Sequence, residues 1–482
     1  MRCLRKLVIT ATVTGILLLF IGDVAFAQDQ QSDDTSKPKT AGRVYPLVGY
    51  PDQDPSGDQA STPPLQPDTG PLTGVQNPTL GSPEVRHSYW VPGIQYSNAV
   101  RSNSLNASEN SSWNSTNYVT GNLSLLQGWR DASLSVNYSG GGYFSNDSTQ
   151  GSGQFQQLSL GYQLDERRWQ LLFMDQFAYL PESSFGFGAS TGLALPGISG
   201  SLGASVPGLQ GSYLPNQSIF ESVGPRYSDT GTAQLTYQLS ARNSITLAGV
   251  YGILRFVDSG NVESNNPSAV AGYNHTLSRK DSVGVSYRFS AYQYLGNAQA
   301  LGDHVAQVVY GRKITGRMAL QLAGGPDFTT FRIPISGMKS KLSGSGNATL
   351  TYAFKQSSVS LNYSHGLNGG SGVLVGSSAD QFGVIASRQL SRVWQGNLNF
   401  SYARNSALNN QSGLSSSAFD TWYAGAGLAR PLGRAANFSI AYQAQNQKQN
   451  LSPCNGTSCS TSYVVNQIIL SFQWHTQPLV IR

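Results

Sequence analysis

Strict alternation of apolar and polar residues recurs along most of the chain and limits its fold more than any other feature. The segment 132–139, ASLSVNYS, alternates alanine, leucine, valine and tyrosine with serine and asparagine. The same pattern recurs near 232–239, 283–290, 350–354, 359–363, 394–402 and 437–443. Side chains of a β-strand point alternately to opposite faces, so this period of two predicts strands with one apolar and one polar face. We predict an all-β protein with strands of about ten residues.

The polar faces consist almost entirely of Ser, Thr, Asn, Gln and Gly, and only 12% of all residues are charged. A sheet with one face in water normally carries Lys and Glu on that face. Many apolar rows end in Tyr, Phe or Trp, as expected at a membrane interface. We therefore predict a transmembrane antiparallel β-barrel with an enclosed polar side. A soluble secreted β protein is the alternative, which extraction without detergent would indicate.

Short and long connections alternate between these segments and predict the number of strands. Tight turns are expected near 127–131, 165–168, 240–243, 278–281, 315–317, 355–357, 391–392 and 431–434. Long connections are expected near 101–115, 141–152, 181–228, 257–266, 295–301, 328–344, 366–378, 404–416 and 447–460. Together they join about 18 strands, the first within 87–100 and the last near 462–474, with both termini in the periplasm. A count of 16 is the fallback, because Pro92 interrupts the first strand.

The chain divides into three predicted parts. Residues 1–27 combine a basic start, an apolar stretch and the triplet Ala25-Phe26-Ala27, which is typical of a cleaved signal peptide. Residues 28–86 hold ten of the 22 prolines and are expected to form a disordered periplasmic tether. Residues 87–482 form the predicted outer-membrane barrel.

Two cysteines lie close together near the end of the chain. Cys454 and Cys459 stand in the stretch SPCNGTSC, among residues that favour turns. In an exported protein such a pair is expected to form a loop disulfide, and two thiols without a nearby histidine make a poor zinc site.

These features resemble those of bacterial outer-membrane β-barrels of the general porin type, over roughly residues 87–474. The resemblance implies a channel for passive or weakly selective diffusion of small polar or neutral solutes across an outer membrane. Phe472 and Trp474 look like the terminal aromatic signal that the barrel-assembly machinery reads, although residues 475–482 follow them. Outer-membrane lipid, lipopolysaccharide and small solutes are the other expected partners. The pattern leaves open whether the barrel is a monomer or a homotrimer.

The third long connection, about 181–228, resembles in position the loop that narrows the channel of general porins. It carries the candidate constriction residues Phe185, Phe187, Tyr213 and Phe220 and few charges. We expect it to fold into the lumen and to favour neutral solutes. The alternative is an external loop that packs against lipopolysaccharide or a neighbouring subunit. The candidate lumen-lining residues are Arg288, Gln234, Gln238, Asn397 and Asn399.

No constellation of residues indicates an enzyme, a cofactor or a metal site. The five histidines are dispersed, and no pair has the spacing of metal ligands. The bases are dispersed too, whereas a nucleic-acid site would cluster them. Two alternatives to a channel remain. The first is a non-conducting structural or adhesive barrel with exposed loops. The second is a barrel-embedded hydrolase that uses His275 or His365.

Overall fold

The computed structural model describes residues 88–104, 112–146, 151–180, 219, 225–258, 261–335, 337–354, 357–370, 372–408, 416–433, 435–452, 460–477 and 479–480. Within these ranges no helix is long and apolar enough to cross a membrane. The expected signal peptide, the tether and the cysteine pair lie outside the described residues.

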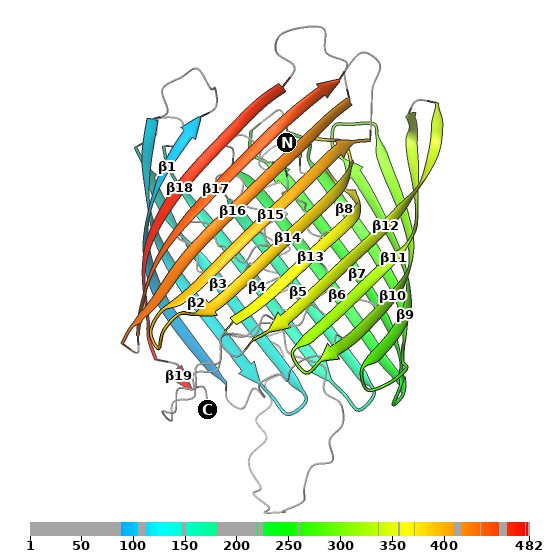
Figure 1. Cartoon of the computed structure of the whole chain (residues 1–482), viewed down its shortest axis with the longest axis horizontal. Helices are drawn as coiled ribbons and strands as arrows, with labels where there is room; N and C mark the ends of the chain where they lie inside the picture. Colours follow the sequence, from blue (N-terminus) through cyan, green and yellow to red (C-terminus); the bar gives the residue numbers. More distant parts are fainter. Residues whose placement is uncertain are drawn as a thin grey trace, which may run out of the picture. The chain divides into compact units, whose positions relative to one another are not determined.

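Eighteen long antiparallel strands form one closed barrel, in which each strand pairs with its neighbours in sequence and β1 pairs with β18 (Figure 1). The strands are β1 (Tyr89–Ser104), β2 (Ser112–Gly128), β3 (Ala132–Ser145), β4 (Ser152–Asp165), β5 (Trp169–Leu180), β6 (Arg226–Ser240), β7 (Asn243–Phe256), β8 (Ser264–Thr276), β9 (Asp281–Tyr294), β10 (Ala300–Thr315), β11 (Met318–Ile335), β12 (Met338–Ala353), β13 (Ser357–Asn368), β14 (Ser377–Gln389), β15 (Gln395–Ala407), β16 (Ser416–Leu432), β17 (Ala436–Ser452) and β18 (Ser460–His475). This architecture confirms the predicted fold class and the count of 18.

The alternation in sequence becomes an apolar outer face and a polar inner face. On β9, Val285, Tyr287 and Phe289 are exposed on the outer face, whereas Ser282 and Ser290 are buried on the inner face. A strand in lipid needs its backbone groups paired within a closed sheet, and its lipid face must be apolar. The exposed apolar residues are therefore those expected to meet lipid.

Aromatic side chains mark both ends of the outer face. Trp169 and Tyr237 lie at the turn ends of β5 and β6, with ring centroids 4.3 Å apart. Tyr179 and Tyr227 lie near the opposite ends of the same strands, with ring centroids 4.7 Å apart. Such paired belts are typical of the two interfaces of a membrane barrel. The ends with tight turns are called periplasmic below, and the ends with long connections are called external.

All eight tight turns lie where the sequence predicts them. The connection between β6 and β7, for example, consists of residues 241 and 242. The strands themselves are longer than the predicted ten residues and range from 12 to 18. They extend beyond the apolar segments because polar residues at the external ends continue the same backbone pairing.

One expected long connection is a paired hairpin instead. Residues 328–344 belong to β11 and β12, which are joined only by residues 336 and 337. Gly337 has φ +78°, which a tight turn of this kind requires and which glycine adopts without strain. Pro334 lies within a register irregularity between Thr330 and Ile335, where the missing N–H removes no ladder bond.

The barrel closes where the two ends of the sheet meet. Phe472 pairs with Tyr96 and Trp474 with Ile94, and all four side chains are exposed on the outer face. Beyond them β19 (Leu479–Val480) adds two further pairs to β1, at Trp90 and Tyr89. Pro92 lies in the gap between these two pairings, so it does not interrupt the first strand.

Candidate functional site

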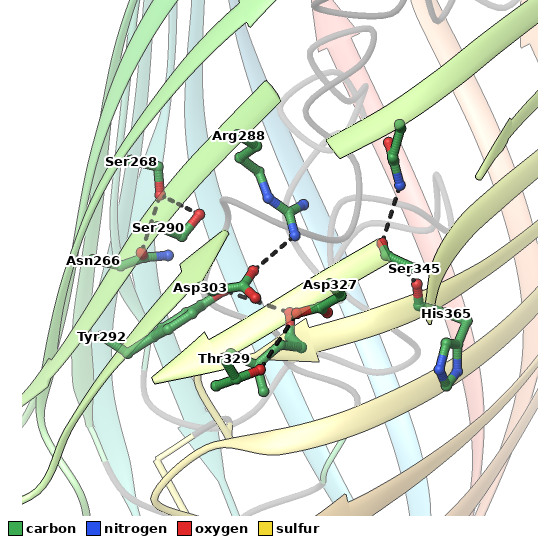
Figure 2. Close-up of polar contacts among 12 residues, drawn as sticks. Asn266, Ser268, Arg288, Ser290, Tyr292, Asp303, Asp327, Thr329, Ser345 and His365 are labelled. Carbon is green, nitrogen blue, oxygen red and sulfur yellow. Dashed lines mark hydrogen bonds and ion pairs between the residues drawn. The ribbon is translucent and has the colours of Figure 1, made fainter. Parts of the chain in front are cut away.

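An ion pair lies on the inner face of the barrel between β9 and β10. A guanidinium nitrogen of Arg288, Nη2, lies 3.0 Å from Oδ2 of Asp303 (Figure 2). The side chain of Arg288 is 12% exposed and that of Asp303 is 0% exposed. Arg288 pairs across the strands with Val305, and Asp303 pairs with Ser290, so the two side chains are diagonal neighbours on one face. Burial of each charge therefore depends on the other.

A second carboxyl group lies beside this pair. Asp327 of β11 is 1% exposed. It pairs with Val305 of β10, and Val305 pairs with Arg288 of β9, so one strand lies between Asp327 and Arg288. The hydroxyl of Thr329 donates a hydrogen bond to Oδ1 of Asp327 (3.3 Å). Figure 2 shows Asp303 and Asp327 next to one another on the inner wall. Two carboxyl groups and one guanidinium thus form a small charged cluster.

Uncharged hydrogen-bonding groups surround the cluster. The hydroxyl of Ser268 donates to that of Ser290 (2.9 Å), and Gln307 Nε2 donates to the hydroxyl of Ser345 (3.0 Å). These groups can exchange hydrogen bonds with water or with the hydroxyls of a solute. Neutral hydrogen-bonding groups on this wall therefore surround one guanidinium and two carboxyl groups.

An apolar cluster covers the same wall toward the external ends of the strands. It consists of Tyr292, Tyr294, Leu301, Phe331, Ile335 and Leu367. Leu301 pairs with Tyr292 on one side and with Phe331 on the other, so the three form a continuous inward row. The apolar row therefore lies between the charged cluster and the external ends of β9 to β11.

On the described parts of β15 to β18, the inner wall is uncharged. Asn399, Thr421, Gln443 and Gln467 lie on β15 to β18 and are nearly or completely buried. Thr421 Oγ1 donates to Gln447 Oε1 (3.2 Å). Amides and hydroxyls alone make up the polar part of this region.

The five predicted lumen-lining residues all lie on inward faces but in three separate places. Arg288 belongs to the charged cluster, whereas Gln234 and Gln238 lie on β6 and Asn397 and Asn399 on β15. Gln234 Nε2 donates to Thr236 Oγ1 (3.4 Å), and Gln238 is exposed near the periplasmic end. Their role as lumen lining remains a proposal.

Sequence reasoning missed Asp303 and Asp327. Asp303 stands in phase with Leu301 and Val305, so the alternating pattern places it in an apolar row and gives no sign of a polar site. Asp327 directly precedes residues that were expected to form a connection. An acidic residue in the middle of a predicted membrane strand was the available signal, because such a residue usually faces the interior.

Between β5 and β6, the structure describes Ile219 and Pro225 of the third long connection. Ile219 is 1% exposed and packs in a cluster with Leu374 and Phe419, which lies on the inner face of β16. The strand that follows Ile219 is β6, which lies ten strands from β16 in one direction around the barrel and eight in the other. Ile219 therefore contacts the wall almost opposite to β6. The candidate constriction residues Phe185, Phe187, Tyr213 and Phe220 lie outside the described residues.

The two histidines of the hydrolase alternative lie on the outer face at opposite ends of the barrel. His275 pairs with Asn243 near the periplasmic turn, and its Nδ1 lies 2.6 Å from Asn243 Oδ1. His365 lies near an external end, where its Nδ1 donates to Asp380 Oδ1 (2.7 Å). Both imidazoles are engaged by an amide or a carboxylate at the membrane interface and not by a serine hydroxyl.

No protein-family model and no curated protein matches the sequence. Among solved structures, the chain is similar to OccK2 (OpdF) of Pseudomonas aeruginosa, with 10% identity over 80% of this chain and 98% of that chain and a TM-score of 0.41. OccAB4 of Acinetobacter baumannii has 8% identity over 81% and 99%, with a TM-score of 0.40. The outer membrane protein OpdK of Pseudomonas aeruginosa has 7% identity over 80% and 99%, with a TM-score of 0.40. The closed antiparallel barrel of 18 strands itself confirms the porin-type architecture that the sequence predicts.

Proposed function

We propose that the protein is an outer-membrane channel for passive diffusion of small polar or neutral solutes. The observation that carries this proposal is the closed barrel of 18 strands with a lipid-compatible outer face and a polar inner face. Barrels of this size enclose a space wide enough for an aqueous channel. A signal peptide over residues 1–27 would account for export.

The third long connection narrows this channel in our proposal. Ile219 supports it, because it packs in a buried cluster with Leu374 and Phe419, whose strand β16 lies almost opposite to β6. The connection is poor in charge, and Arg288 is compensated by Asp303. Both features favour neutral solutes over ions.

A non-conducting barrel is the second candidate, and one observation favours it. Inward side chains of an open 18-stranded barrel should meet water, yet Asn405, Thr421 and Gln467 are 0% exposed. Complete burial of a polar inner wall indicates that the space beside it is filled. Asp303 and Asp327 on the wall of β10 and β11 are buried to the same degree, at 0% and 1% exposed, so the two candidates differ in whether any continuous path remains through the filled space.

Single-channel conductance in planar bilayers separates the candidates. We expect steady openings from the parent protein and a larger conductance from a variant that lacks residues 190–212. The substitution Ile219→Ser is expected to raise conductance or its fluctuations, because it removes the buried contact with Phe419. Val373→Ser is the matched control, since Val373 is exposed beside Leu374.

Each result bears on a different part of the proposal. Silence from folded and inserted parent protein would favour the non-conducting barrel. An open parent whose conductance is unchanged by the deletion and by Ile219→Ser would retain the channel but overturn the constriction.

A further inference from the structure

Five charged or titratable side chains form a continuous row on the outer face of β13 to β17. They are His365, Asp380, Arg404, Asp420 and Lys448, one on each strand. Each is paired in register with the next, because His365 pairs with Asp380, Asp380 with Arg404, Arg404 with Asp420, and Asp420 with Lys448. Directly opposed residues share a face of the sheet, so this charge row runs across five strands near their external ends.

The two cations of the charge row stay exposed to the surroundings although carboxylates lie beside them. Arg404 Nε lies 4.0 Å from Asp420 Oδ1, and the side chain of Arg404 is 57% exposed whereas that of Asp420 is 18% exposed. Lys448, at the end of the row, is also exposed. Each carboxylate can orient a neighbouring cation while leaving part of its charge available to the surroundings.

A row of aromatic side chains lies next to the charge row, two residues nearer the membrane centre on each strand. It consists of Tyr363, Phe382, Tyr402 and Trp422, which are paired in this order across β13 to β16. The hydroxyl of Tyr402 donates to Asp420 Oδ1 (2.8 Å), and that of Tyr363 donates to Asp380 Oδ1 (3.1 Å). Aromatic belts sit at the level where lipid tails meet headgroups, so the charge row lies at the level of the headgroups.

We propose that the charge row binds phosphate groups of lipid headgroups in the external leaflet, and that the lipid is a phosphorylated glycolipid of the lipopolysaccharide class. Arg404 and Lys448 contact the phosphates, Asp420 is a positioning residue beside Arg404, and Asp380 flanks Arg404 in register on the other side. The proposal rests on the proposed outer-membrane location. A solute phosphate is a poorer fit, because the row faces away from the lumen and lies directly beside an aromatic belt.

Stabilisation of the sheet does not by itself account for the charge row. Exposed ion pairs contribute little to stability, and the long Arg404–Asp420 separation limits this one further. Headgroup phosphates offer a larger electrostatic gain to basic residues at a membrane surface. The row holds two carboxylates beside its two cations, but Arg404 is far more exposed than Asp420, so the exposed cations at headgroup level favour lipid phosphates as the occupant.

The test compares the double variant Arg404→Gln/Lys448→Gln with the parent, both folded in detergent and titrated with short-chain lipopolysaccharide. Native mass spectrometry gives the number of retained lipids and the apparent Kd. We expect retention to weaken by about 25-fold, the product of roughly fivefold for each cation. Arg388→Gln/Arg430→Gln is the matched control, because these exposed arginines lie near the periplasmic ends of β14 and β16.

Three results would overturn the proposal. They are equal retention by parent and double variant, equal weakening in the periplasmic control, and complete displacement of the lipid by inorganic phosphate. Arg404→Lys, which keeps the charge, should retain the lipid and so separates charge loss from misfolding. Conductance in phosphatidylcholine bilayers is measured separately, so a silent channel would not be mistaken for a lost lipid site.

Discussion

The inner wall of the barrel has two regions with different chemistry. The wall of β9 to β12 holds Arg288, Asp303 and Asp327 beneath an apolar row, whereas the polar part of the inner wall of β15 to β18 consists of buried amides and hydroxyls. Both are built on the same alternating strands, so the backbone does not explain the difference. A charge can stay on the inner wall only where a partner of opposite sign is within reach. We infer that ion pairing stabilises the wall of β9 to β12. The wall of β15 to β18 is stabilised by packing against the material that fills the lumen beside it.

Loss of the guanidinium should produce the largest difference between the two regions. Arg288→Ala leaves the fully buried Asp303 next to Asp327 without its cation, and we expect the free energy of unfolding to fall by about 3–5 kcal/mol. Reversible urea unfolding in lipid vesicles measures the change. Gln443→Ala on β17 is the control, because it removes an equally buried but neutral side chain and should cost less. Equal losses would show that water, and not Arg288, compensates the carboxyl groups.

The positions of strands and turns could be predicted because their signals are local. Alternation assigns the face of each residue, and residues such as those at 241 and 242 mark a turn without reference to the rest of the chain. The pairing of Arg288 with Asp303 could not be predicted, because it depends on the register between two strands. Nor could the packing of Ile219 with Phe419, because these residues are distant in sequence.

A smaller effect distinguishes two buried tyrosines, one in each region. Tyr423 on β16 is 0% exposed, and its hydroxyl has no hydrogen-bond partner within the described ranges. Tyr292 on β9 is 2% exposed, and its hydroxyl donates to the carbonyl of Leu367 (3.4 Å). Tyr423→Phe should leave stability unchanged or raise it by about 1 kcal/mol, and Tyr292→Phe should lower it by about 1 kcal/mol.

Urea unfolding of the two tyrosine variants under the same conditions gives the sign of each change. Opposite signs would support a sealed hydroxyl at Tyr423 and a bonded one at Tyr292. A clear loss of stability in Tyr423→Phe would mean that its hydroxyl has a partner that the described residues do not include, and the contrast between the two regions would weaken.

The smallest expected effect concerns ions that pass the charged region. Asp327→Asn removes one negative charge from the inner wall, and a unit charge about 8 Å from an ion contributes ~0.5 kcal/mol in water. We therefore expect the permeability of cations relative to anions to fall by about twofold at low salt, and by less as salt screens the charge. The reversal potential in a salt gradient measures this ratio. Asp420→Asn removes the same charge from the outer face and should leave the ratio unchanged. Equal shifts in both variants would mean that the charge of Asp327 affects permeating ions no more than a charge on the outer face does. The charged region would then have no role in selectivity.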